Sequence, residues 1–188
     1  MTKEGFDPIV GKTVKILILG TFPGEESLKQ QQYYAHPRNL FWDMIAVICG
    51  TDLIDDYEKR CDLVRSEGIA IWDVLKSCDR EGSSDGRIRR DNFIFNDISS
   101  FISEYPLKVI FFNGKKAAIL FKQYVDPAIL PSQPQLLILP STSPAYATLS
   151  KQQKLERWLE VKTYLAVTTS HKPLEPIRQA FHSQLVPL

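Results

Sequence analysis

Residues able to bind a polar ligand are concentrated between Ile16 and Trp42. The stretch opens with an apolar run whose length is typical of a buried strand, and Gly20 and the pair Pro23-Gly24 then form a loop. Backbone amides in such a loop are free to bind an anion or the polar edge of a ring. The run Tyr34-Ala35-His36-Pro37-Arg38-Asn39 adds a flat aromatic surface, an imidazole, a cation and a carboxamide. Together these residue types indicate a functional site.

The same residues also fit a purely structural role. Adjacent tyrosines in front of a helix often pack into a core, and Asn39 has the side chain of a good helix N-cap. On these residues alone, the functional and the structural interpretations stand equal.

The elements that must position this stretch are strands that alternate with helices. Short apolar segments predict four strands, at Val14–Leu19, Ile69–Trp72, Leu107–Phe112 and Leu136–Leu139. Amphipathic segments predict helices after Asn39, over Asp55–Ser66, after Asn96, after Gly114 and from Ser150, which forms a capping-box pattern with Gln153. The alternation predicts an α/β fold of three layers, α/β/α, with a central, mainly four-stranded parallel sheet.

Polar residues follow each of the predicted strands. The loop from Gly20 to Asn39 follows the first strand, Asp73 the second, Asn113 the third and Ser141–Tyr146 the fourth. In open parallel sheets, ligands bind beyond the carboxyl ends of the strands. We therefore expect these four segments to meet at one edge of the sheet.

Two segments are predicted to lie outside this regular pattern. Ser77–Asn92 is polar and rich in turn-forming residues, and it contains a candidate cationic cluster of Arg80, Arg87, Arg89 and Arg90. Beyond Leu165, prolines and polar residues predict a loose tail with a short helix near Ile177–Phe181.

The composition is that of a globular protein. Its 188 residues, with 44% hydrophobic and 24% charged side chains, predict a single domain over residues 1–188, with a lead-in at 1–13 and a loosely packed tail at 166–188. No apolar stretch is long enough to span a membrane and the N-terminus has no secretion signal, so a cytoplasmic location is expected. The cysteines Cys49, Cys61 and Cys78 make neither a disulfide framework nor the four-cysteine set of an iron–sulfur cluster. Neither a metal nor a cofactor is expected.

Two motifs give the chain a family resemblance. Gly20-Thr21-Phe22-Pro23-Gly24, followed by Tyr34–Asn39 and Phe41-Trp42, resembles motif 1 of the uracil-DNA glycosylase superfamily. Within it, the chain most resembles the branch of hypoxanthine (deoxyinosine) DNA glycosylases, and motif 1 is also similar to that of mismatch-specific uracil-DNA glycosylases. Leu139–Ala145 resembles motif 2, and the resemblance spans roughly Val14 to Tyr164.

The resemblance implies a uracil-DNA glycosylase-like fold and a monofunctional DNA glycosylase of base excision repair. Such an enzyme flips a deaminated base, here expected to be hypoxanthine, out of DNA and hydrolyses its N-glycosidic bond with a positioned water. A mismatch or uracil-DNA glycosylase is the alternative. A non-catalytic nucleotide-binding module and a glycosidase of free nucleosides are alternatives from other classes. However, G-x-x-P-G is neither a Walker loop nor the dinucleotide-binding fingerprint, and motif 2 has no obvious task on a free nucleoside.

The resemblance also implies roles for individual residues. Asn39 is expected to position the water, because Phe22 occupies the loop position at which many superfamily members carry a carboxylate or carboxamide. The implied base-binding residues are Gly20, Thr21, Phe22, Pro23, Gly24, Tyr34, Asp73 and Asn113, with Tyr34 stacked on the flipped base. The implied DNA-binding residues are His36, Arg38, Ser141, Thr142, Ser143, Pro144, Ala145 and Tyr146, with Ser143 on a phosphate and Tyr146 as the wedge between bases.

The expected partner is damaged DNA, bound by a monomer. The formal net charge of +1 argues against binding through a large basic surface. Contacts to phosphate are therefore expected to be few and local, through Ser143, the loop amides and the arginines between Arg87 and Arg90.

Overall fold

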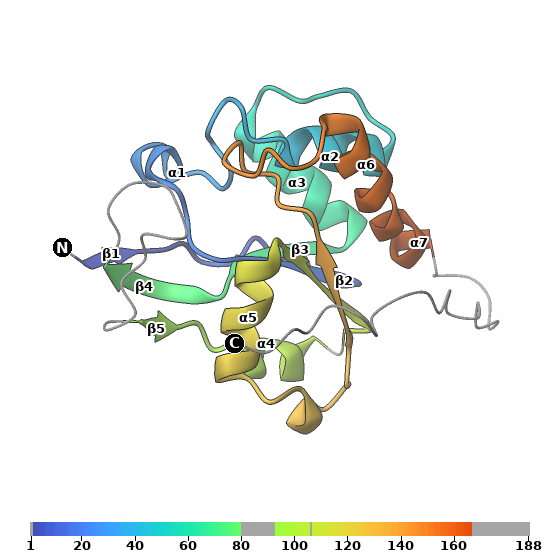
Figure 1. The fold of residues 1–188 in the computed structure, drawn as a ribbon. Coiled ribbons are helices and arrows are strands. Elements are labelled where there is room, and N and C mark those ends of the chain that lie inside the picture. The colour runs from blue at the N-terminus through green and yellow to red at the C-terminus, as the bar shows by residue number, and fades with distance from the viewer. Residues whose placement is uncertain (1, 80–92, 106, 167–188) are drawn as a thin grey trace.

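The computed structural model describes residues 2–79, 93–105 and 107–166, and at its centre lies a four-stranded parallel sheet (Figure 1). The strands lie in the order β3-β2-β6-β7 and consist of Ile69–Asp73 (β3), Ile16–Gly20 (β2), Val109–Asn113 (β6) and Gln135–Leu139 (β7). All four predicted strands are confirmed, with ends shifted by no more than two residues.

Alternate side chains of each strand pack into two different hydrophobic cores. In β2, Leu17 and Leu19 point into one core, whereas Ile16 and Ile18 point into the other. All four side chains are fully buried. A strand that is covered on both faces has no need of polar residues, which explains the continuous apolar run in the sequence.

Helices close both cores. One is closed by α2 (Phe41–Cys49), α3 (Tyr57–Glu67), α6 (Lys151–Trp158) and α7 (Glu160–Ala166). The other is closed by α4 (Ile98–Glu104) and α5 (Lys115–Tyr124), and Figure 1 shows the two groups on opposite sides of the sheet. The short helix α1 (Glu25–Gln30) and the 3-10 helix η3 (Pro127–Ile129) lie in connecting loops. The predicted three-layer α/β/α architecture is confirmed.

A small antiparallel sheet, which the sequence did not predict, lies beside the parallel one. It consists of β1 (Thr2–Glu4), β4 (Leu75–Asp79) and β5 (Ile94–Phe95), in the order β1-β4-β5. The segment predicted as a lead-in is thus paired with the rest of the chain: Thr2–Glu4 pairs with β4, and Ile9 is buried and forms a bridge to Ile71.

Side chains at the helix ends largely agree with the sequence patterns. The capping box of Ser150 and Gln153 at the start of α6 is confirmed. The helix that was predicted after Asn96 is present as α4, but its N-cap is Asp97, which accepts the hydrogen bond from Ser100 N, and not Asn96. Asn96 is buried instead, and its Nδ2 donates to the carbonyl of Asp73 over 2.9 Å.

The segment Ser77–Asn92 was predicted to be irregular, which is wrong for Ser77–Asp79, because they belong to β4. The helix predicted from Ser150 is interrupted at Leu159, so that α6 and α7 are separate. The arginine cluster and the helix near Ile177–Phe181 lie outside the described residues. Among the residues that the structure describes, no helix has the length and apolarity needed to cross a membrane.

Candidate functional site

The polar ends of the four parallel strands lie at the same edge of the sheet, as predicted. Gly20 at the end of β2 pairs with Asp73 at the end of β3. Asn113 at the end of β6 pairs with Leu139 at the end of β7, directly before motif 2. The strand register therefore brings motif 1, Asp73, Asn113 and motif 2 together.

Gly20 is tightly enclosed by two of the predicted base-binding side chains. A Cβ atom on Gly20 would lie 2.2 Å from Asp73 Oδ1 and 3.0 Å from Tyr34 Oη. Asp73 itself is only 3% exposed. Only glycine lets the Asp73 carboxylate and the Tyr34 hydroxyl approach the strand end so closely.

Tyr34 forms an aromatic surface that is held in place from behind. Its ring stacks on Phe41 of α2, with centroids 3.8 Å apart and an angle of 15° between the planes. Its backbone has a φ of 57°, which lies in the left-handed region and is unusual for a tyrosine. Phe41 was not among the predicted site residues, because in the sequence it is simply the first apolar position of a helix.

Tyr33 keeps this loop in place. Its hydroxyl donates to the carbonyls of Phe6 and Asp7, and its own carbonyl accepts from Trp42 Nε1 over 3.0 Å. Burial raises the pKa of Tyr33 well above its ordinary value, and the nearby Asp73 carboxylate raises it further. Of the two adjacent tyrosines, one is therefore structural and the other forms the ring surface.

The loop Gly20–Gly24 is almost entirely buried, which limits how it can contact a ligand. Phe22 is only 6% exposed, and its side chain packs into the core closed by α4 and α5. Thr21 is also buried, and its carbonyl accepts from Leu75 N over 3.1 Å. Since the Phe22 ring is part of the core, a ligand at this loop would contact the backbone of the loop and not the Phe22 side chain.

Asn39 lies at the entry to α2, directly before the N-cap residue Leu40. Its Oδ1 accepts from Phe41 N over 3.0 Å, while its own N–H donates to the carbonyl of His36 over 2.8 Å. Asn39 therefore has a structural role at the start of α2, although it is not the N-cap residue. The bond to Phe41 is made by Oδ1, so the amide NH₂ group remains the part of the carboxamide that is suited to another task. Of its neighbours, Arg38 is exposed and His36 is half-buried.

Asn113 and Thr142 form a two-way contact. Asn113 Nδ2 donates to Thr142 Oγ1, and Thr142 N donates to Asn113 Oδ1, both over 2.9 Å. Thr142 is fully buried, and its carbonyl accepts from Leu40 N over 3.1 Å. Contact with a base was predicted for Asn113, but in this structure its side chain supports motif 2. The Thr142 side chain was predicted to bind DNA, but it is too deep to reach DNA.

The rest of motif 2 is a compact turn with an exposed tip. Ser141 Oγ accepts from Ser143 N, and Ser143 Oγ accepts from Ala145 N, each over 3.2 Å. The carbonyl of Ser143 also accepts from Tyr146 N over 3.0 Å. Pro144 and Ala145 are exposed, so the tip of the turn is available to a partner.

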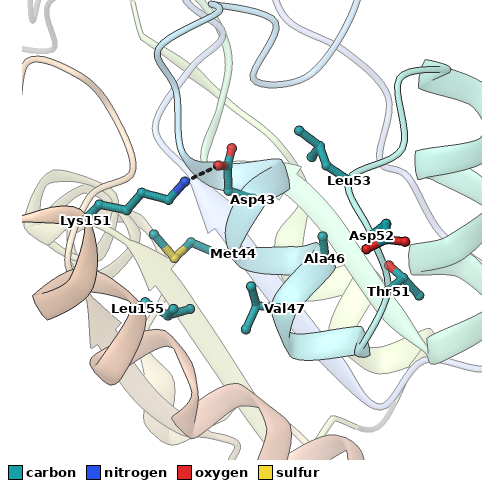
Figure 2. A pocket seen from close by; sticks show the side chains of 9 residues that line it. All are labelled: Asp43, Met44, Ala46, Val47, Thr51, Asp52, Leu53, Lys151 and Leu155. Atoms are coloured by element: carbon teal, nitrogen blue, oxygen red, sulfur yellow. Dashed lines mark hydrogen bonds and ion pairs between the residues drawn. The ribbon is translucent and has the colours of Figure 1, made fainter.

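A separate pocket of about 220 Å³ lies between α2 and α6 and is lined by Asp43, Met44, Ala46, Val47, Thr51, Asp52, Leu53, Lys151 and Leu155 (Figure 2). None of the predicted site residues lines it. Its rim contains the ion pair between Lys151 Nζ and Asp43 Oδ1, which connects α6 with α2. This pocket is distinct from the sheet edge where the two motifs meet.

The sequence profile of the Uracil DNA glycosylase superfamily matches residues 8–166, which include both motifs and all four parallel strands. The chain belongs to the uracil-DNA glycosylase superfamily. The predicted family and fold are thereby confirmed.

Individual relatives within the superfamily are also similar. A hypoxanthine DNA glycosylase of Methanosarcina acetivorans is 37% identical over 158 residues, which cover 83% of this chain and 96% of the relative. The protein of the same description from Methanosarcina barkeri is 40% identical over 119 residues, covering 62% of this chain and 74% of the relative. The solution NMR structure of a candidate uracil DNA glycosylase from M. acetivorans has a TM-score of 0.73 and 35% identity, and it covers 88% of this chain and 99% of that one.

Proposed function

We propose that this uracil-DNA glycosylase superfamily member removes hypoxanthine from deoxyinosine-containing DNA by hydrolysing the N-glycosidic bond. The observation that carries the proposal is the meeting of motif 1, Asp73 and motif 2 at one sheet edge, in a chain whose relatives include two hypoxanthine DNA glycosylases. The chain acts as a monomer, since both motifs come from one copy of the chain. The DNA on which it acts is cytoplasmic.

The flipped base stacks on Tyr34 in this proposal. One face of the Tyr34 ring is covered by the Phe41 ring, with the two ring centroids 3.8 Å apart, so the Tyr34 ring is held in place before a base arrives. Stacking of a base on such a ring is worth about 1–3 kcal/mol. This energy offsets part of the cost of taking the base out of the duplex.

The polar edge of the base lies between Asp73 and the backbone of the Gly20–Gly24 loop. The Asp73 carboxylate accepts from N1–H of the purine, and amides near Phe22 and Gly24 donate to O6. Because the departing base develops negative charge, backbone donors that already point at its edge stabilise the transition state more than the ground state. Burial of Phe22 in the core leaves its backbone as the part available for this contact.

Asn39 orients the attacking water. A carboxamide cannot accept a proton near neutral pH, so the reaction depends mainly on departure of the base, and Asn39 contributes position. It stands next to Leu40, whose N–H is bound by Thr142 of motif 2. In this proposal, the position of the water therefore depends on the hydrogen bond between Leu40 and Thr142, which joins the two motifs.

Uracil excision is a second candidate, favoured by the similarity to the candidate uracil DNA glycosylase of known structure. The N3–H and O4 groups of uracil present a similar donor and acceptor to Asp73 and the loop amides. The two bases differ in size, because hypoxanthine has two rings and requires more space beside Tyr34 than uracil does.

An end-labelled duplex with a single deoxyinosine tests the proposal. We expect strand cleavage at the inosine only after alkali treatment, because a monofunctional glycosylase leaves an intact abasic site. The Tyr34→Phe variant, which keeps the ring, should retain activity, whereas Tyr34→Ala should lose about tenfold or more. A folded wild-type protein that leaves the inosine strand alkali-resistant would refute the proposed activity.

A further inference from the structure

Lys154 is a buried cation to which the proposed mechanism gives no role. It lies on α6 and is only 3% exposed, and its Nζ donates to the carbonyl of Tyr146 over 2.7 Å. The ammonium also stands 5.2 Å from the centroid of the Tyr146 ring, within the range of a cation–π interaction. Burial lowers the pKa of Lys154. A buried charge is costly, and a methionine would fill the same space without that cost.

Lys154 and Trp158 both connect α6 to the motif 2 loop. Trp158 lies one turn further along α6 on the same face, and its Nε1 donates to the carbonyl of Pro140 over 2.9 Å. Pro140 precedes the loop and Tyr146 ends it, so α6 contacts both ends. The helix is itself fixed by its capping box and by the ion pair of Lys151 with Asp43 (Figure 2).

The contact at Tyr146 determines where the tip of the loop points. Tyr146 N donates to the carbonyl of Ser143, and Ala145 N donates to Ser143 Oγ, so residues 143–146 form a closed turn. The exposed tip, Pro144 and Ala145, belongs to this turn. A donor that fixes the Tyr146 carbonyl therefore fixes the orientation of the whole turn relative to the sheet edge.

We propose that Lys154 is a positioning residue, which holds the motif 2 turn in the orientation that enters the duplex as the base is flipped. The inference rests on the proposed function. A wedge is needed only where a base has to leave a stack. Loss of Lys154 should therefore affect duplex substrates far more than single-stranded ones.

Three variants test the role of Lys154. Lys154→Met removes the donor and keeps the length of the side chain, Lys154→Arg keeps a donor, and Arg157→Met removes a charge from an exposed position of the same helix. For Lys154→Met we expect single-turnover excision of hypoxanthine to fall about tenfold or more on duplex DNA, and much less on a single strand of the same sequence. Lys154→Arg should recover part of the loss, and Arg157→Met should leave the ratio of the two rates unchanged.

Amide hydrogen exchange provides a readout that does not depend on activity. Lys154→Met should speed exchange at Ala145 and Tyr146 while the melting temperature stays close to that of the wild type. Equal losses on duplex and single strand, or unchanged exchange in the turn, would overturn the inference. If the wild type excises nothing from either substrate, the proposed function fails and so does the role in flipping, whereas the exchange rates still decide whether Lys154 holds the turn.

Discussion

Asn113 and Thr142 hold each other through two hydrogen bonds of 2.9 Å, one in each direction. The pair connects the end of β6 to motif 2, and the carbonyl of Thr142 continues the connection to Leu40 at the entry of α2. Thr142 is fully buried, so the motif 2 turn is positioned in part by a side chain that does not reach the surface.

A double-mutant cycle tests this contact. Asn113→Ala removes both hydrogen bonds, whereas Thr142→Val removes only the bond to Oγ1, because Thr142 N belongs to the backbone. Each variant should lower single-turnover excision by about tenfold, since each leaves a partner unsatisfied at a cost of about 1–3 kcal/mol. Once Asn113 is alanine, the Thr142 hydroxyl has no bond to lose to it, so the double variant should lose clearly less than the product of the two single losses. Fully multiplicative losses would show that Asn113 has a separate task, such as contact with the base.

Gly20 is a second position where a small change should have a large effect. An added methyl group would stand 2.2 Å from Asp73 Oδ1, so Gly20→Ala must displace that carboxylate or the Tyr34 hydroxyl. We expect excision to fall about a hundredfold. Gly50→Ala is the matched control, because Gly50 has a φ of 71° and open space around it. The control should lower the melting temperature while activity at low temperature persists. Full activity of Gly20→Ala would place the base elsewhere.

Asn39 has a structural role, because it accepts from Phe41 N at the start of α2, and a proposed catalytic role. Substitution by serine can separate the two. In the Asn39→Ser variant the new hydroxyl would still offer an oxygen to Phe41 N, but the amide group that is proposed to orient water would be missing. Asn39→Ala loses both. We expect both variants to lose most single-turnover activity, and only Asn39→Ala to lose about 1 kcal/mol of stability, the usual net contribution of one hydrogen bond. Retained activity in Asn39→Ser would leave Asn39 with only its structural role at the start of α2.

The half-buried thiol of Cys49 predicts a loss of stability in alkali. Burial raises its pKa from 9.0 to about 11, so the folded protein keeps this proton at a pH where the unfolded chain has lost it. The contribution to stability is therefore fully present below pH 9 and is lost as the pH rises through about 11. Urea unfolding between pH 8 and pH 11 should show a shallower decline for Cys49→Ala than for the wild type. Parallel declines would mean that Cys49 does not contribute.

The parallel sheet and its polar edge were predictable because the signals are local. A strand buried on both faces must be apolar throughout, as at Ile16–Leu19, and parallel strands place the following loops at one edge. The capping box at Ser150 is likewise written in four consecutive residues.

The contacts that refine the site depend on tertiary structure. Nothing near Asn113 in the sequence indicates that its carboxamide pairs with Thr142, which lies 29 residues further on. Lys154 looks like any surface lysine of an amphipathic helix until α6 is packed against motif 2. The antiparallel sheet was missed for a related reason, because Thr2–Glu4 is polar and forms a strand only by pairing with β4.

The measurement that tests the central claim most directly is a comparison of single-turnover rates on matched duplexes containing inosine or uracil, each opposite the same base. In the proposed mode of binding, both bases can stack on Tyr34 and contact Asp73, so a difference between the rates reflects how well the site accommodates the second ring. We predict that hypoxanthine leaves at least about tenfold faster than uracil, which corresponds to about 1.4 kcal/mol. Uracil excision at an equal or greater rate would contradict the assignment of this chain to hypoxanthine.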